Sequence, residues 1–92
     1  MLYTLSFVRK QPEAGDVFTF SFVRPKGMKH EAGKHGIFIL PGLYRPHPFT
    51  ISSSPDEEYI TVTTHTETGS RYKKRLLSMQ PGDKIWFIGP IM

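Results

Sequence analysis

Hydrophobic and polar residues alternate along four stretches of the chain, and this period of two predicts β-strands with one apolar face. The stretches are Leu2–Val8, Val17–Val23, Tyr59–His65 and Asp83–Ile88. Residues typical of turns, Pro12–Asp16, join the first two, so we expect these to pair as an antiparallel hairpin. Within the second stretch, Phe18, Phe20 and Phe22 share one face, and this aromatic stripe is expected to lie in the core.

The stretch His47–Pro55 predicts an extended edge strand, because Pro48 has no N–H group to give to a neighbour. Alternation places Phe49 and Ile51 on one face and Thr50 on the other. An unpaired edge beside a flat ring suits a flat polycyclic ligand with carbonyls and ring nitrogens. The alternative is that Phe49 and Ile51 are core residues and Thr50 belongs to a solvated face.

Two more elements complete the fold. His35–Leu40 is apolar almost throughout, which predicts a buried strand. Ser70–Ser78 predicts the single helix, with Ser70 as its N-cap and Tyr72 and Leu76 on one apolar stripe. Six short strands and one helix predict an all-β domain over residues 1–92: a six-stranded antiparallel Greek-key barrel with one short helix.

The start of the predicted helix is a candidate anion site. Gly69 and Ser70 stand where helix amides point outward, an arrangement that suits a phosphate or pyrophosphate. The helix adds four cations, Arg71, Lys73, Lys74 and Arg75. The alternative is a capped surface helix with a solvated basic face.

Composition removes several classes of function. The 92 residues include no cysteine, which excludes disulfides, thiolate metal sites and a cysteine nucleophile. Four histidines on different elements show no metal-ligand spacing, so no metal site is expected. No apolar run approaches the ~20 residues of a membrane span. The net charge of +4 and the many aromatic residues leave a barrel for single-stranded nucleic acid as an alternative. The stripe is better explained as core, however, and no nucleic-acid partner is expected.

Five short motifs together resemble one known family. They are Gly33-Lys34-His35, His47-Pro48-Phe49-Thr50, Gly69-Ser70, Gln80-Pro81-Gly82-Asp83-Lys84 and Gly89-Pro90. In this order they resemble the flavin-binding barrel domain of the ferredoxin-NADP reductase superfamily. The His-Pro-Phe-Thr form is similar to that of ferric reductases and NADPH oxidases. The resemblance implies an FAD-binding module of an NAD(P)H-dependent flavin oxidoreductase, which passes electrons from nicotinamide through flavin to an acceptor.

The resemblance also implies roles for the edge strand. Phe49 would stack on the isoalloxazine, and Thr50 would hydrogen-bond near flavin N5, which makes it the candidate catalytic residue. His47 stands where the family usually has an arginine that holds phosphate or ribityl oxygens, with Pro48 beside it and Arg45 nearby as a permanent charge. Because imidazole changes charge near neutral pH, FAD retention is expected to depend on pH.

Further cofactor contacts are implied nearer the helix. Thr63, Thr64 and His65 would lie on the strand that supports the flavin phosphates or adenosine. Gly69 and Ser70 would bring helix amides to the pyrophosphate. Lys73 takes the place of the family's phosphate-binding Ser or Thr, so its charge is expected to add to those amides.

The family's second half, an NAD(P)-binding domain with a glycine-rich turn, has no counterpart in this sequence. We therefore expect a fragment of a longer oxidoreductase that is not active alone, with the NAD(P)-binding domain on the same polypeptide and an unknown electron acceptor. The expected location is the cytoplasm or the cytoplasmic face of a membrane protein. FMN in place of FAD, or an empty barrel that serves only as a docking surface, are the alternatives within the family.

Overall fold

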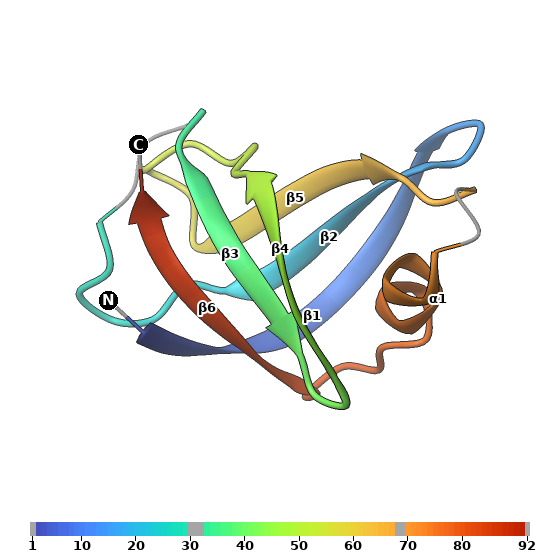
Figure 1. The fold of residues 1–92 in the computed structure, drawn as a ribbon. Helices are drawn as coiled ribbons and strands as arrows, with labels where there is room; N and C mark the ends of the chain where they lie inside the picture. Colours follow the sequence, from blue (N-terminus) through green and yellow to red (C-terminus); the bar gives the residue numbers. More distant parts are fainter. Residues whose placement is uncertain (1, 30–32, 68–69, 92) are drawn as a thin grey trace.

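The computed structural model describes residues 2–29, 33–67 and 70–91, and within residues 43–46 it describes the backbone alone. Over these described residues the chain forms six strands and one short helix, as the sequence predicts (Figure 1). The elements are β1 (Leu2–Ala14), β2 (Val17–Val23), β3 (His35–Leu40), β4 (Leu43–Thr50), β5 (Tyr59–His65), α1 (Arg71–Leu77) and β6 (Lys84–Ile91).

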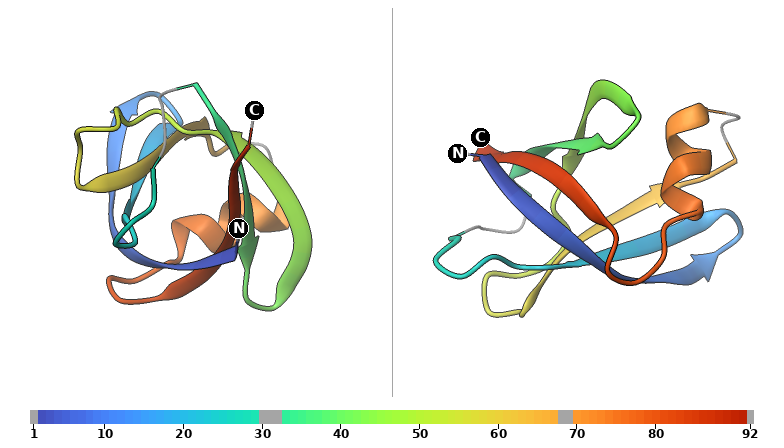
Figure 2. Two further views of the ribbon diagram at one scale, coloured as in Figure 1. Left: turned by 90° about the vertical axis from the view of Figure 1, so that its left-hand side faces the viewer. Right: turned by 90° about the horizontal axis from the view of Figure 1, so that it is seen from below.

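The strands form one antiparallel sheet in the order β4-β3-β6-β1-β2-β5. Neighbours that are distant in sequence, such as β2 with β5 and β6 with β1, give the Greek-key pattern. The sheet curls around a common core, as the end-on view in Figure 2 shows. It does not close by strand pairing, because β4 and β5 are its two edges. The predicted edge strand over His47–Pro55 is confirmed as far as Thr50; the strand begins earlier than expected, at Leu43, and residues 51–55 lie beyond its end.

Two hydrogen bonds hold the edge strands β4 and β5 near each other at one end. Just after β4, the Ser52 amide donates to the Thr61 carbonyl at 2.9 Å, and the Ser53 hydroxyl accepts from the Thr61 amide at 3.1 Å. At the other end the strands diverge, and α1 lies between them (Figure 1). We call the space between β4 and β5, bounded by these contacts and by α1, the β4–β5 seam.

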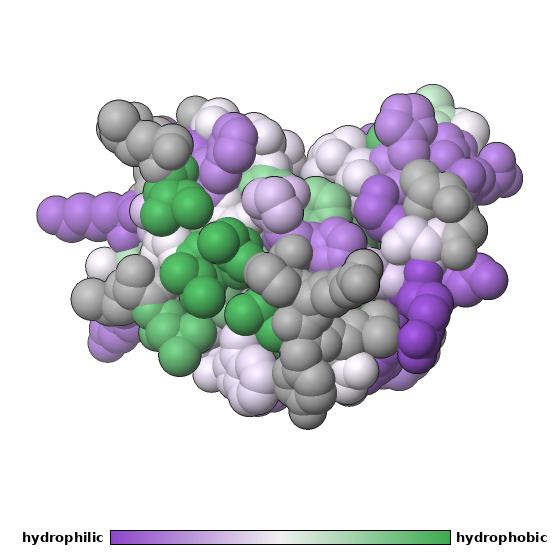
Figure 3. Space-filling view, in the orientation of Figure 1, coloured by the Kyte–Doolittle hydropathy of each residue, from purple (hydrophilic) through white to green (hydrophobic). Residues whose placement is uncertain are grey.

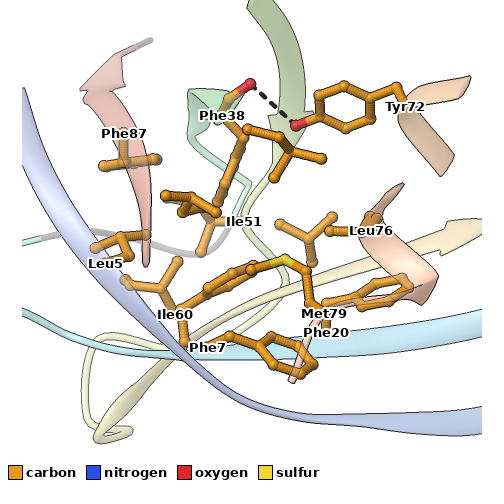
Figure 4. Close-up of a cluster of buried hydrophobic side chains, with 14 of the residues drawn as sticks. Leu5, Phe7, Phe20, Phe38, Ile51, Ile60, Tyr72, Leu76, Met79 and Phe87 are labelled. Carbon is orange, nitrogen blue, oxygen red and sulfur yellow. Dashed lines mark hydrogen bonds between the residues drawn. The ribbon is translucent and has the colours of Figure 1, made fainter. Parts of the chain in front are cut away.

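The core is apolar and tightly filled. Phe20 and Phe22 are at most 1% exposed and Phe18 is partly buried against the core, which confirms that the aromatic stripe of β2 points inward. Phe20 and Phe87 of β6 are among the core side chains drawn in Figure 4. Among the described residues, an apolar hollow lined by Phe38, Phe49 and Tyr72, among others, has a volume of about 10 Å³, which is far too small for a cofactor. We therefore expect a cofactor to bind on the outer surface.

The first hairpin is longer than its sequence suggests. β1 continues through Pro12 to Ala14, which pairs with Val17, so the turn consists of Gly15 and Asp16 rather than the whole of Pro12–Asp16. Gly15 has φ +57°, a conformation that glycine adopts without strain. Pro12 is tolerated because this half of β1 pairs with β2 alone, which leaves its other side as an edge.

The strand β3 is buried on one face only, which corrects the expectation of a fully buried strand. Phe38 and Leu40 are buried, whereas Ile37 and Ile39 are partly exposed. Ile37 pairs with Ile88 and Ile39 with Trp86 on β6, and Leu2 of β1 follows on the same outer face. Figure 3 shows apolar side chains gathered over these strands. The run of apolar residues in β3 thus serves an apolar outer surface as well as the core.

Candidate functional site

An aromatic cluster lines the β4 side of the seam. The ring centroids of His47 and Tyr72 lie 3.8 Å apart, and the Phe49 centroid lies 5.8 Å from that of Tyr72. Phe38 packs edge-on against Phe49 at 5.8 Å. Phe49 is partly buried, so one part of its ring contacts the core while another remains accessible. The cluster can offer a flat, apolar surface at an unpaired strand edge.

Tyr72 fixes the helix against this cluster. Its side chain is 3% exposed, and its hydroxyl donates to the Phe38 carbonyl at 3.0 Å (Figure 4). Burial raises the pKa of the Tyr72 hydroxyl above its ordinary value, so the group stays a neutral donor. Leu76, one turn further along α1, enters the core. Together these two side chains set the position of α1 in the seam.

Lys73 places a cation at the same point. Its Nζ donates to the Thr64 hydroxyl at 2.9 Å and to the His65 carbonyl at 2.6 Å, and it lies 5.7 Å from the centroid of the Phe49 ring. Desolvation lowers the pKa of Lys73, against the opposing charge of Asp16. An ammonium has three donors, and these bonds use two of them. The third is available for an anion at the end of the seam.

Ser70 caps the helix as the sequence predicts. It has an extended backbone, and its hydroxyl accepts from the amides of Tyr72 at 3.1 Å and Lys73 at 3.4 Å. Two amides that a pyrophosphate would use are therefore bonded to the cap. The positive charge of Lys73 is the stronger attraction for an anion here.

Asp16 and His65 tie the β1–β2 turn to the end of β5. The Asp16 carboxylate lies 2.9 Å from His65 Nδ1 and accepts from the Glu67 amide at 2.9 Å. The bond with His65, followed by that from Glu67, lowers the pKa of Asp16 to about 2. The strand that carries Thr64 and His65 is thus held in place near its end.

This arrangement predicts a pH-dependent stability. Because its folded pKa is depressed, Asp16 contributes stability that is fully present above its ordinary pKa of 3.8 and is lost as the pH falls toward about 2. We expect Asp16→Asn to melt below the wild type at pH 6, with the difference vanishing near pH 2. Thermal unfolding across this range measures it. Asp56→Asn, in the exposed β4–β5 loop, is the control, and an equal pH profile in both variants would contradict the assignment.

The structure brings some predicted site residues together and separates others. His47, Phe49, Thr64 and Lys73 meet at the seam, and His65 joins them through its carbonyl. The remaining described residues point elsewhere: Pro48 and Thr50 are exposed on the other face of β4, and Thr63 bonds with Thr19 at 2.8 Å outside the barrel. The side chain of Arg45 and the whole of Gly69 lie outside the described residues.

Two residues of the site carry no separate signal in the sequence. Tyr72 reads as one member of an apolar helix stripe, yet it contacts both His47 and Phe49. Asp16 reads as a turn residue, and its bond to His65 spans 49 positions. For Tyr72, the only hint in the sequence is an aromatic residue directly before Lys73. For Asp16, nothing nearby in the sequence indicates the bond to His65.

Within the described ranges, no group of three or more metal-ligating side chains could hold a metal ion. The helix found there, α1, is too short to cross a membrane.

The sequence matches a family described as FAD-binding domain over residues 3–86. The chain belongs to this family, which confirms its resemblance to the flavin-binding barrel of the ferredoxin-NADP reductase superfamily. Among its relatives is the stachydrine N-demethylase reductase subunit Stc4 of Rhizobium meliloti (strain 1021), with 36% identity over 94 residues. The match covers 94% of this chain and 26% of that protein, so the chain spans about a quarter of its curated relative.

Solved structures share the fold at lower identity. The cytochrome P450 reductase GcoB of Amycolatopsis superposes with a TM-score of 0.84 at 17% identity, over 98% of this chain and 28% of that chain. A ferredoxin NADP+ reductase from Neisseria gonorrhoeae with bound FAD and NADP gives 0.80 at 13% identity, over 95% and 36%. In both, this fold forms one part of a longer reductase chain.

Proposed function

We propose that the chain is the FAD-binding module of an NAD(P)H-dependent oxidoreductase, with the flavin at the β4–β5 seam. The observation that carries the proposal is the pairing of the Phe49 ring with the Lys73 ammonium at an unpaired strand edge. A flavin needs this combination, because its ring system is flat and apolar while its tail is anionic. Membership of a family of FAD-binding domains supports the choice of ligand.

The described residues fit the cofactor. Phe49 would stack on the isoalloxazine. Thr50 is exposed on the opposite face of β4, so it would hydrogen-bond near N5 only where the flavin extends past the strand edge, and its role stays a prediction. Lys73 would hold the diphosphate with its remaining donor, and Thr64 keeps that ammonium in place. The bound flavin supplies the electron chemistry, while the protein orients the ring and balances its charge. His47 and His65 flank this arrangement, and their effect on the pH dependence of FAD retention stays a prediction.

The source and destination of the electrons belong to the proposal as well. Because the chain spans about a quarter of its curated relative, the rest of such a protein would include the NAD(P)-binding domain. The relative is named as a reductase subunit, and we infer a comparable role for this chain, with an electron acceptor whose identity is open. We place the domain in the cytoplasm or at the cytoplasmic face of a membrane protein.

A flavin titration tests the proposal. We expect the purified domain to quench flavin fluorescence and to bind FAD more tightly than FMN, because FMN lacks the second phosphate and the adenosine. We expect FMN to bind more tightly than riboflavin, because riboflavin has no phosphate. Equal affinity for FAD and FMN would place the adenosine outside the site. A folded domain that binds none of the three would overturn the assignment.

Replacement of Lys73 separates the tail from the ring. We expect Lys73→Met to weaken FAD binding by about tenfold, the cost of one charge-assisted contact, with little change for riboflavin. Lys26→Met, in the exposed β2–β3 loop, is the matched control for lost charge. Equal losses for FAD and riboflavin would show that Lys73 acts on the fold rather than on the diphosphate.

A further inference from the structure

A second cationic site lies on the side of α1 away from the seam. A surface hollow of about 470 Å³ separates the helix from the β3–β4 turn. It is lined by Pro41, Gly42, Arg71, Lys74, Arg75 and Ser78. Figure 3 shows strongly hydrophilic surface over the part of the molecule where α1 lies. The volume is within the range of small-molecule sites, and none of the aromatic residues of the seam takes part.

The three cations differ in how they suit the helix, because Lys74 and Arg75 lie in its last turn, where positive charge is favourable, whereas Arg71 does not. The last carbonyls of the helix already have donors, since Lys10 Nζ bonds to the Leu77 carbonyl and the Ser78 amide to that of Lys74. Arg71 stands in the first turn, where acidic residues are favoured and none is present. It also lies four positions before Arg75, a spacing at which like charges repel. The position of Arg71 thus opposes the helix locally, which indicates a role in binding.

The charges of the hollow are not balanced by the carboxylates that the structure describes. Asp16 bonds to His65, and Glu57 accepts from the Ser54 amide, both away from the hollow. No described carboxylate lines the hollow itself. Arg75 is held in place by a 3.3 Å bond from its guanidinium to the Ser78 hydroxyl, which reduces the entropy that a ligand must overcome.

We propose that this hollow binds a phosphorylated small molecule with at least two negative charges, through Arg71, Lys74 and Arg75. Guanidinium groups match phosphate oxygens in a bidentate fashion, and the lysine adds a point charge. The hollow is open to solvent and is bounded on one side by the Pro41–Gly42 turn, which leaves room for a compact ligand between that turn and the helix. The site is distinct from the proposed flavin site and does not rest on it.

Pyrophosphate is the probe for the experiment. We expect it to shift the amide signals of Gly42, Arg75 and Ser78 in a saturable way when titrated into the isotope-labelled domain, with and without FAD. The double variant Arg71→Gln/Arg75→Gln should lower the affinity by about tenfold. Lys26→Gln/Lys29→Gln, which removes the same charge from the exposed β2–β3 loop, should leave it unchanged. Circular dichroism confirms that each variant is folded.

Two results would overturn the inference. If FAD abolishes the pyrophosphate shifts, the hollow is part of the flavin site and not a second site. If the shifts fail to saturate, or weaken equally in both double variants, they report general charge attraction. Flavin absorbance recorded on the same samples keeps the two proposals apart, because a domain that saturates with pyrophosphate but refuses FAD contradicts only the flavin assignment.

Discussion

Gly36→Ala should destabilise the domain by about 3 kcal/mol and lower its melting temperature by more than about 10 °C. A Cβ at this position would overlap Cε1 of Phe87, a ring that is 0% exposed at the centre of the core. The ring cannot withdraw without disturbing its neighbours, and the Phe38 centroid lies only 4.9 Å away. Urea or thermal unfolding measures the loss.

A double-mutant cycle isolates this contact. Phe87→Leu alone should be destabilising, because it leaves unfilled space in the core. Combined with Gly36→Ala, the smaller side chain makes room for the new methyl group. The two changes together should therefore cost less than the sum of the single changes. A strictly additive result would show that the clash with the Phe87 ring is not the source of the loss in stability.

Local patterns carried the prediction of most strands. The strands β2, β3 and β5 begin and end where alternation and turn residues place them, since both signals lie within a few positions. The length of β1 could not be predicted this way. Its second half exists because β2 pairs with it past Pro12, and a proline reads as a turn until the free side of the strand is known.

The candidate site was predictable where one residue type suits the proposed chemistry. Phe49 was identified from its place on the edge strand and Lys73 from the resemblance, and the structure places Lys73 Nζ 5.7 Å from the centroid of the Phe49 ring. Their meeting depends on α1 crossing the seam, which Tyr72 secures through a carbonyl 34 positions away. Contacts between residues so far apart in the sequence depend on how the sheet curls, which local patterns in a single sequence do not predict.

The open seam links the fold to the proposed chemistry. A fully closed barrel would bond both edges of β4 and β5 and leave no strand edge for a ligand. Here Ser52 and Ser53 join the strands at one end while α1 keeps them apart at the other. The same helix carries Lys73 to this end of the seam. One short element therefore both lies between the two strands and supplies the positive charge beside them.

Phe49→Ala should weaken FAD binding by roughly 30-fold, or about 2 kcal/mol. The substitution removes the flat surface on which the isoalloxazine would stack and the ring that lies beneath Lys73. Phe49→Tyr keeps both and should bind FAD within a few-fold of the wild type. Phe49→Leu keeps the apolar contact with Phe38 but not the flat ring, so its affinity should fall between the two. Fluorescence titration with FAD and riboflavin measures the series.

The control for this series is Tyr3→Ala, which removes another partly buried aromatic side chain that packs against the same core. Tyr3 lies on β1, remote from the seam, and contacts Phe87. If Tyr3→Ala weakens FAD binding as much as Phe49→Ala, the loss comes from the core and not from stacking. If Phe49→Leu binds as well as Phe49→Tyr, the flavin does not lie on this ring, and the proposed position of the cofactor is wrong.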